Sequence, residues 1–256
     1  MNTKKTWIKS LQIILLLSAI SLPCLAQQVV HVENKRMSFK NQGFSGTFDM
    51  SANFVQNIND IFQTANGAQV QYIKNNTSLL SVSSLNLTVF NESKIVNDGF
   101  QHLRYNYKMN KTVTAEAFLQ GQYNEVIKIR SRFLAGIGPR FTIISKDSLR
   151  LFIGSLYMYE MEEETTDLKN RHHRTSTYVS FGFPLAKAIT VDFIGYFQPD
   201  MMNVSDFRAS VEAIVELKIS KRMGFRLAHG FFHDSKPPAG IRRNFYNFRN
   251  GLKYEF

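Results

Sequence analysis

Apolar and polar residues alternate along most of this chain, in runs that are longer than ordinary globular strands. From Gly43 to Val55 the even positions are mainly apolar and the odd positions mainly polar. The same period recurs over residues 112–123 and 127–137, and most regularly over 207–219. Because successive side chains of a strand point to opposite faces, each run predicts a strand with one apolar and one polar face.

The length of these runs separates two all-β architectures. A soluble sandwich turns its apolar side chains inward, on strands of about five residues. A membrane barrel turns apolar side chains toward lipid and polar ones toward the lumen, on strands of about ten residues or more. The runs match the second pattern. We therefore predict an all-β fold, a transmembrane antiparallel up-and-down β-barrel of about twelve strands over residues 43–256.

The breaks between the runs fall into two length classes. Short breaks lie at residues 74–77, 109–112, 145–148, 184–188 and 220–223. Longer polar connections lie at residues 91–99, 160–173, 198–206 and 233–244. This asymmetry is typical of bacterial outer-membrane barrels, so we predict that both termini are periplasmic, the short breaks periplasmic turns and the longer ones extracellular loops.

The first 26 residues have a different character from the rest. Three lysines precede the apolar run LQIILLLSAISLP. The segment ends in CLA, with small residues at the positions that a signal peptidase recognises. The apolar run is short for a membrane span, and Pro23 before Cys24 argues against a lipid anchor. We predict a cleaved signal peptide at 1–26, with an uncleaved anchor as the alternative, and a periplasmic N-terminal lead at 27–42.

Removal of the signal peptide takes away Cys24, the only cysteine, and three lysines. The remaining chain carries 28 basic residues (31 minus 3) against 20 acidic ones, a formal charge of +8. No thiol is left for a disulfide or a cysteine-ligated metal site. An exported barrel has no access to nucleic acid, so this basic excess predicts no nucleic-acid partner.

The chain ends in RNGLKYEF, an alternating run that continues to the last residue. The ends of soluble domains are usually frayed and polar. This segment resembles the closing strand of outer-membrane barrels, in which a polar residue, a glycine and two spaced aromatics are read by the barrel-assembly machinery. The resemblance implies that this machinery is a partner during biogenesis and that its signal consists of Arg249, Gly251, Tyr254 and Phe256.

The chain also resembles the salt-induced outer-membrane protein family, a domain of unknown function, in the segments QYNEVIKIRSRFLAGIGPRF, LFIGSLYMYE and FHDSKPPAGIRRNFYNFRNGLKYEF. The similarity extends over most of residues 43–256. One departure lies in the first hairpin, where Val55, Gln56 and Asn57 replace a Gly-Asn pair near the tip. The resemblance implies a barrel in the outer membrane, in contact with its lipids and lipopolysaccharide, and it brings no activity.

Two polar clusters are candidates for a catalytic or a metal site. His233, Asp234 and Ser235 are adjacent, but neighbouring side chains point apart, whereas a catalytic triad needs its base between nucleophile and acid. An acidic patch over residues 160–167, taken as part of a loop, lacks the glycine-punctuated spacing of a calcium loop. We therefore predict no catalytic, cofactor-binding or metal site and no enzyme, with a lipid hydrolase only as the third hypothesis.

The polar faces of the predicted strands carry more basic than acidic residues. They predict a basic belt in the lumen, in which Arg130 and Arg132 share one face of one strand, formed by Lys128, Arg130, Arg132, Arg150, Arg174, Arg208 and Arg226. Rings of one charge sign select ions, but charges inside a small barrel can also pair and fill it. Two hypotheses follow: a narrow or plugged barrel with a structural or envelope-stress role, and a narrow channel for small anions or acidic oligosaccharides.

Overall fold

The computed structural model describes residues 42–56, 60–146, 149–220 and 223–254. They form a short 3-10 helix, η2 (Glu125–Ile127), and twelve strands: β1 (Gly43–Gln56), β2 (Asp60–Lys74), β3 (Thr77–Phe90), β4 (Ser93–Lys108), β5 (Val113–Asn124), β6 (Ile129–Lys146), β7 (Leu149–Glu164), β8 (Lys169–Ala186), β9 (Ile189–Pro199), β10 (Phe207–Lys218), β11 (Met223–Asp234) and β12 (Asn244–Tyr254). The predicted signal peptide, residues 27–41 of the predicted lead, and Phe256 lie outside the described residues.

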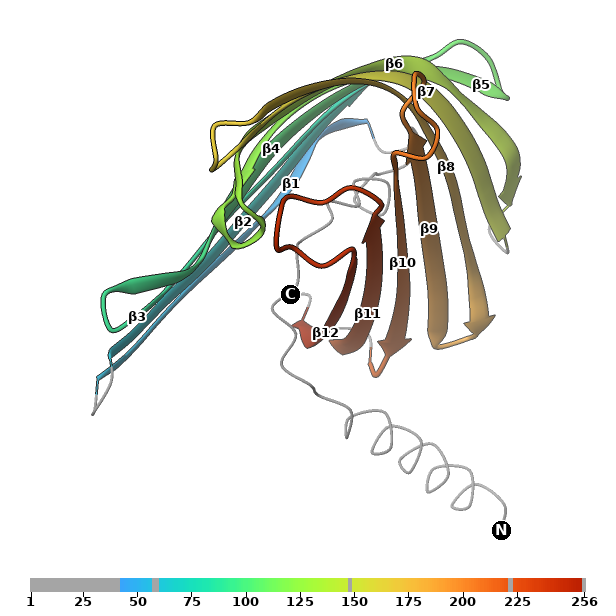
Figure 1. The fold of residues 1–256 in the computed structure, drawn as a ribbon. Helices are drawn as coiled ribbons and strands as arrows, with labels where there is room; N and C mark the ends of the chain where they lie inside the picture. Colours follow the sequence, from blue (N-terminus) through green and yellow to red (C-terminus); the bar gives the residue numbers. More distant parts are fainter. Residues whose placement is uncertain (1–41, 57–59, 147–148, 221–222, 255–256) are drawn as a thin grey trace.

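The twelve strands form one sheet in which each strand pairs with the next along the chain. All the pairings are antiparallel, and the sheet order is β1 to β12 without a crossover. The sheet curls around an interior, with β1 and β12 at its two ends (Figure 1). This confirms the predicted all-β, antiparallel up-and-down fold and its strand number. Among the described residues, no helix is long and apolar enough to cross a membrane.

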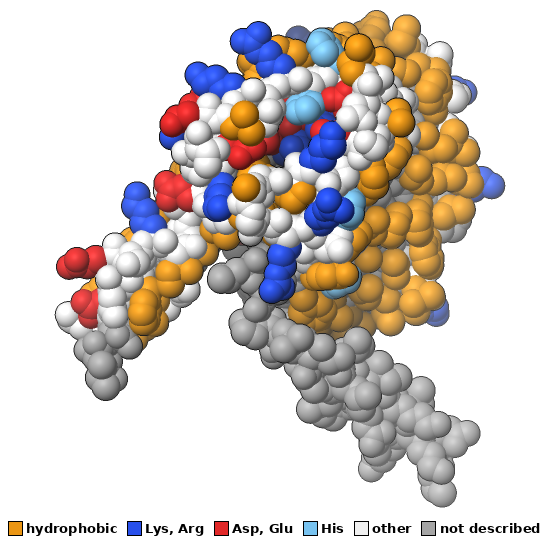
Figure 2. All heavy atoms as spheres, viewed as in Figure 1, with side chains coloured by type: hydrophobic (Ala, Val, Ile, Leu, Met, Phe, Trp, Pro, Cys, Tyr) orange, Lys and Arg blue, Asp and Glu red, His pale blue; other side chains and the backbone are white. Residues whose placement is uncertain are grey.

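The two faces of the sheet have the inverted character that the alternation predicts. On β10 the buried positions include Arg208, Ser210 and Glu212, which face the interior. On the outer face, by contrast, Leu119 and Ile137 are each more than 60% exposed. Apolar side chains cover much of the outer surface in view (Figure 2). The chain therefore buries polar groups and exposes apolar ones, opposite to a soluble domain.

Two of the predicted long loops are strands in the structure. β3 and β4 meet at a two-residue turn, so most of residues 91–99 belongs to β4. β7 continues through Glu164 and β8 begins at Lys169, which leaves a short turn in place of the predicted loop 160–173. In both segments polar residues occur on both faces, so the sequence alternation ends while the backbone ladder continues. The longer connections that remain are 200–206 and 235–243.

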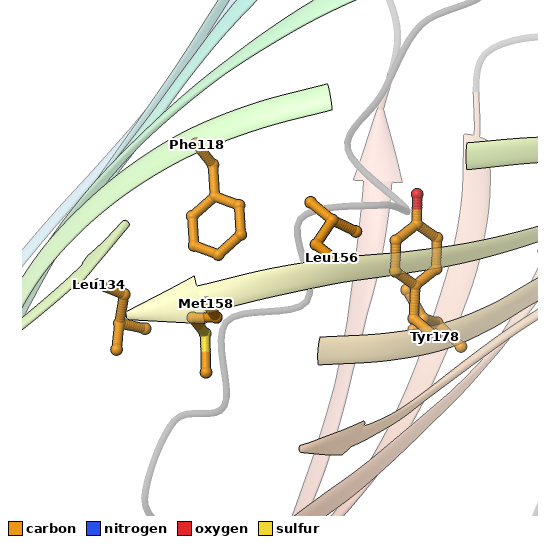
Figure 3. Close-up of a cluster of buried hydrophobic side chains, with 6 residues drawn as sticks. Phe118, Leu134, Leu156, Met158 and Tyr178 are labelled. Atoms are coloured by element: carbon orange, nitrogen blue, oxygen red, sulfur yellow. The ribbon is translucent and has the colours of Figure 1, made fainter. Parts of the chain in front are cut away.

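Apolar side chains fill part of the interior. A buried apolar cluster consists of Phe118, Leu134, Leu156, Met158, Tyr178 and Ile194, contributed by β5 to β9 (Figure 3). Two glycines on the inner face make room for its rings. A Cβ on Gly136 would overlap the ring of Phe118, and a Cβ on Gly154 would overlap the ring of Tyr178. The absence of a side chain at these two positions therefore lets the rings lie flat against the wall.

We expect Gly154→Ala to destabilise the fold, because the added methyl must displace the Tyr178 ring. Overpacking of this kind costs about 1–3 kcal/mol. Gly230→Ala is the matched control on the inner face of β11, where a Cβ meets its nearest neighbour at an ordinary 3.7 Å. The measurement is the urea concentration that unfolds half of the protein. Equal midpoints for the two variants would contradict the packing explanation.

Candidate functional site

A buried carboxylate on β7 is held by three arginines from three other strands. Glu160 is fully buried and points into the interior. Arg132 Nε on β6 lies 2.8 Å from Glu160 Oε1, and Arg174 Nε on β8 lies 2.7 Å from Oε2. Arg208 Nη1 on β10 also donates to Oε1. The side chains of these arginines are no more than 7% exposed, so the ion pairs are shielded from water.

Sheet register and curvature together bring these side chains into contact. Arg132 lies opposite Glu162 in the β6–β7 ladder, and Arg174 lies opposite Met158 in the β7–β8 ladder. Both are therefore neighbours of Glu160 on the inner face. Arg208 is separated from β7 by two strands, and it reaches Glu160 across the concave side of the sheet. The contact thus depends on the curl of the sheet.

Three further carboxylates complete this group, which we call the charged layer. Arg208 Nη2 donates to Glu162 Oε2 at 3.0 Å, and Arg208 Nε donates to Asp234 Oδ2 at 2.7 Å. Arg174 Nη2 donates to Asp206 Oδ1 at 2.9 Å. The charged layer therefore consists of Glu160, Glu162, Asp206, Asp234, Arg132, Arg174 and Arg208. Four carboxylates compensate three guanidinium groups, so the layer offers no excess positive charge to an anion.

A second charged group lies on the other side of the apolar cluster. Glu116 is within 3.7 Å of both Arg104 Nη1 and Arg140 Nη1, and it accepts a 2.7 Å hydrogen bond from the Tyr178 hydroxyl. Along the inner face of β6 the order is Arg132, Leu134, Gly136, Gly138 and Arg140. The apolar cluster is therefore layered between two sets of buried ion pairs.

The structure places the seven predicted belt residues in several environments. Arg132, Arg174 and Arg208 lie together in the charged layer. Lys128 lies in the η2 turn, where its Nζ donates to Ala239 O at 2.7 Å. Arg150 pairs with Asp192 at 2.9 Å, and Arg226 lies 3.9 Å from Glu216, with all four side chains at least one third exposed.

Arg130 differs from the prediction, because it does not share a face with Arg132. Arg130 pairs with Glu163 at 2.9 Å and with Asp167, and it is about half exposed. The neighbours of Glu163 on β7, Glu162 and Glu164, are buried on the inner side. The β6–β7 register shifts between residues 129 and 131, and this extra residue turns Arg130 away from the interior.

Sequence reasoning missed the carboxylates of the charged layer. The break pattern predicts an extracellular acidic loop around Glu160 and Glu162, whereas the structure places them on β7. A usable signal was present in the sequence MYEMEEE, in which Glu160, Glu162 and Glu164 recur at period two. That spacing places them on one face of a strand.

The other singled-out residues have separate partners. His233 Nδ1 lies 2.7 Å from Asn244 Oδ1, and Ser235 Oγ accepts from the Phe207 N–H at 2.8 Å. Asp234 belongs to the charged layer, so these three neighbours do not converge. Of the predicted assembly signal, Arg249 Nη2 donates to Glu212 Oε1 at 2.6 Å, Gly251 lies opposite Arg226, and the backbone of Tyr254 pairs with Met223.

The connection after β9 is held by Asp200. Its Oδ2 lies 2.5 Å from His172 Nδ1, and its Oδ1 accepts from the Met202 N–H at 2.7 Å. Burial raises the pKa of Asp200, but the hydrogen bonds from His172 and the Met202 N–H outweigh this and hold the pKa below its ordinary value. Asp200 therefore ties the 200–206 connection to β8.

Residues 40–256 match the family model described as "Protein of unknown function, DUF481". The chain belongs to the DUF481 family. No curated protein sequence matches this DUF481 chain significantly.

Solved structures with a similar arrangement include one described as "NanC porin structure in rhombohedral crystal form", with a TM-score of 0.49 and 10% identity over 83% of this chain and 98% of that chain. Another is described as "KdgM porin", with a TM-score of 0.43 and 10% identity over 77% and 96%. A third is the translocator domain of autotransporter NalP from Neisseria meningitidis, with a TM-score of 0.40 and 9% identity over 83% and 87%.

Glu160→Gln is expected to lower the stability of the DUF481 chain by about 3–5 kcal/mol, because it leaves three buried guanidinium groups with one carboxylate fewer. Glu163→Gln is the matched control on the same strand, where the ion pairs with Arg130 and Lys169 are open to solvent and contribute little to stability. Urea unfolding of the purified protein measures both. A Glu160→Gln midpoint equal to that of Glu163→Gln would contradict the assigned role of Glu160.

The Met202 amide is expected to lose protection from hydrogen exchange as the pH falls below about 3.8, the ordinary pKa of an aspartate. Because the folded pKa of Asp200 is lowered, its stabilisation is complete above that value and is lost as the carboxylate takes up a proton. The measurement is the hydrogen-exchange rate of the Met202 amide, divided by its intrinsic rate at each pH.

The Met201 amide, which donates to His173 O at 2.7 Å, is the internal control and should keep its protection. Asp200→Ala should remove the protection of Met202 throughout the pH range. If the exchange protection of the Met202 amide in the unsubstituted protein does not change with pH, Asp200 does not hold this connection.

Proposed function

We propose that this DUF481 chain is an integral β-barrel of the bacterial outer membrane, closed to through-flow by its own side chains, with a structural role in the envelope. The observation that carries the proposal is the apolar cluster layered between two sets of buried ion pairs on the inner face. A barrel whose interior is filled in this way leaves no continuous path for water or solutes.

The outer face of the sheet supports insertion into a membrane. Strands of 11 to 18 residues are long enough to cross a bilayer at a tilt. Their exposed faces carry large apolar side chains, among them Leu119, Phe133 and Ile137. Contact of these side chains with water is unfavourable. Their inward faces carry the charges. Lipid around the outside and packed side chains within satisfy both faces.

The packing of the interior supports closure. Each member of the apolar cluster is at most 9% exposed, so little space is left for water between these side chains. An ion would have to shed its hydration to pass this level, at a cost that buried apolar surroundings do not repay. The arginines beyond it are already neutralised by carboxylates.

The location and biogenesis proposed here follow from the sequence. A signal peptide at 1–26 directs export, the lead at 27–42 and both termini face the periplasm, and the closing strand ending in Tyr254 and Phe256 is read by the assembly machinery. The surrounding lipids and lipopolysaccharide are the predicted partners. The proposal includes two finer assignments: membership of the salt-induced outer-membrane protein family and a role in envelope stress.

One observation favours a second candidate, a narrow anion-preferring channel for small anions or acidic oligosaccharides. Arg226 and Arg249, on the inner side of β11 and β12, have side chains 46% and 49% exposed. They lie at the β12 end of the sheet, away from the apolar cluster. A water-filled lane along these strands would present positive charge, although each arginine also pairs with a glutamate.

Electrical silence is the result expected when the protein, purified from outer membranes of a Gram-negative host, is inserted into a planar bilayer under a salt gradient. Replacing Phe118, Met158 and Tyr178 together by alanine removes the bulk of the apolar cluster. This triple variant is expected to show steady current, because the level that excludes ions becomes wide and wet.

The matched control replaces Leu119, Phe133 and Ile137 on the outer face by alanine and should stay silent. Insertion is verified for each variant by its recovery in the outer-membrane fraction and its folded gel mobility. Steady anion-selective current through the unsubstituted protein, lowered by Arg226→Gln, would overturn the closed barrel in favour of the channel. A protein absent from the outer-membrane fraction would overturn the location.

A further inference from the structure

The short connections at one end of the sheet are rich in lysine. Because neighbouring strands are antiparallel and pair in chain order, the connections after β2, β4, β6, β8 and β10 lie along one edge of the sheet, which we call the turn end. Counted from the last residue of one strand to the first of the next, these five connections carry eight basic residues and one acidic residue. The six connections at the opposite edge, the loop end, carry five basic and eight acidic residues. The two ends therefore differ in the sign of their charge.

Every connection at the turn end contributes at least one lysine. The lysines that the structure describes in these connections, which we call the lysine rim, are Lys74, Lys108, Lys111, Lys146, Lys187 and Lys218. Lys108 is partly exposed, and the other five are exposed. Successive connections are two strands apart, which is about 10 Å at a strand spacing of about 4.8 Å. The rim therefore presents its ammonium groups at several points along the edge of the sheet, and not as one cluster.

The lysines of the rim have no carboxylate partner among the described residues. Asp192 on β9 and Glu216 on β10 are acidic side chains close to the turn end. Each of them already has an arginine partner, Arg150 at 2.9 Å and Arg226 at 3.9 Å. Within the described part of the chain the charge of the lysine rim is therefore uncompensated, unlike that of the charged layer.

Exposed apolar side chains alternate with the lysines at this end. Met109, Leu185 and Ile219 lie in or beside three of the five turns, and each is more than half exposed. On β4 the exposed apolar face continues to the turn through Tyr105 and Tyr107. A lysine packs its four-carbon stem along apolar surface while its ammonium group stays in a polar layer. This combination fits the boundary between acyl chains and phosphate headgroups, whereas a sugar polymer would leave the apolar groups in water.

We propose that the lysine rim binds the phosphate groups of anionic phospholipids in the membrane leaflet around the turn end. This inference rests on the proposed function, because a barrel in the outer membrane with periplasmic turns places the rim in the inner, phospholipid leaflet. The attraction of one lysine to an anionic membrane surface corresponds to about a fivefold gain in binding. The compact charge of lysine imposes no bidentate geometry, which suits headgroups that exchange with the bulk lipid. The rim thus holds the turn end at the level of the headgroups and draws anionic lipid to the barrel wall.

The lipid selectivity of the reconstituted barrel tests the lysine rim. The protein, purified from outer membranes, is placed in phosphatidylcholine vesicles that contain a trace of spin-labelled phosphatidylglycerol or spin-labelled phosphatidylcholine. Electron paramagnetic resonance then measures the fraction of each labelled lipid that the protein immobilises. We expect phosphatidylglycerol to be enriched about twofold or more over phosphatidylcholine, because the sites beside a lysine gain about fivefold. High salt should remove the enrichment, since exposed charges are screened.

Two matched variants locate the source of the selectivity. Replacing all six lysines of the rim by glutamine should abolish the enrichment and leave the barrel folded, because these lysines have no partner among the described residues. The control replaces six exposed basic residues at or near the loop end by glutamine, namely Lys94, Lys169, Arg171, Lys236, Arg242 and Arg243. The control should keep the enrichment, and folded gel mobility is verified for both variants. Equal loss in the two variants, or an unsubstituted protein without a preference for phosphatidylglycerol, would overturn the proposal.

Two further measurements separate this proposal from its alternatives. Retention of the protein on isolated peptidoglycan that the six-lysine variant loses, without any phospholipid preference, would assign the rim to the cell wall and overturn the lipid assignment. In intact cells, Asn76→Cys in a chain with Cys24→Ser should resist a membrane-impermeant maleimide. Labelling of this cysteine would place the turn end outside the cell and overturn the inner-leaflet assignment. Lipid selectivity does not depend on conductance, so a conducting barrel with this selectivity would contradict only the proposed function.

Discussion

The interaction on which the interior depends is the contact of Glu160 with three arginines. A carboxylate in this position is stable only if cations replace the water it has lost, and no single strand can supply them. Arg132, Arg174 and Arg208 come from both neighbouring strands and from β10 across the interior. The same contact that neutralises the charge therefore links β6, β7, β8 and β10 across the concave side of the sheet.

The apolar cluster depends on this curvature in turn. The rings of Phe118 and Tyr178 lie over the neighbouring strands because their ladder partners, Gly136 and Gly154, have no side chains. The Tyr178 hydroxyl then reaches Glu116 in the second charged group. Packing and electrostatics thus alternate along the barrel axis, and each layer restricts the position of the next.

Long alternation made the fold class and strand number predictable, because an inverted pattern over ten or more residues has few other physical explanations. The strand ends were less predictable. β7 and β8 continue past the apolar band, where polar residues on both faces hide the period. Arg130 was misplaced because a single extra residue in the ladder reverses the face, and no composition signal marks it. The Arg208–Glu160 contact depends on curvature, which local sequence does not record.

The charged layer also shows why a count of lumen arginines does not predict ion selectivity. Selectivity depends on the charge that remains after pairing and on access to water. Arg132, Arg174 and Arg208 are matched by four carboxylates and are dry, so their field is cancelled at close range. Arg226 and Arg249 retain access to water, yet each has a glutamate partner. The buried arginines of the charged layer therefore act first as internal crosslinks between strands.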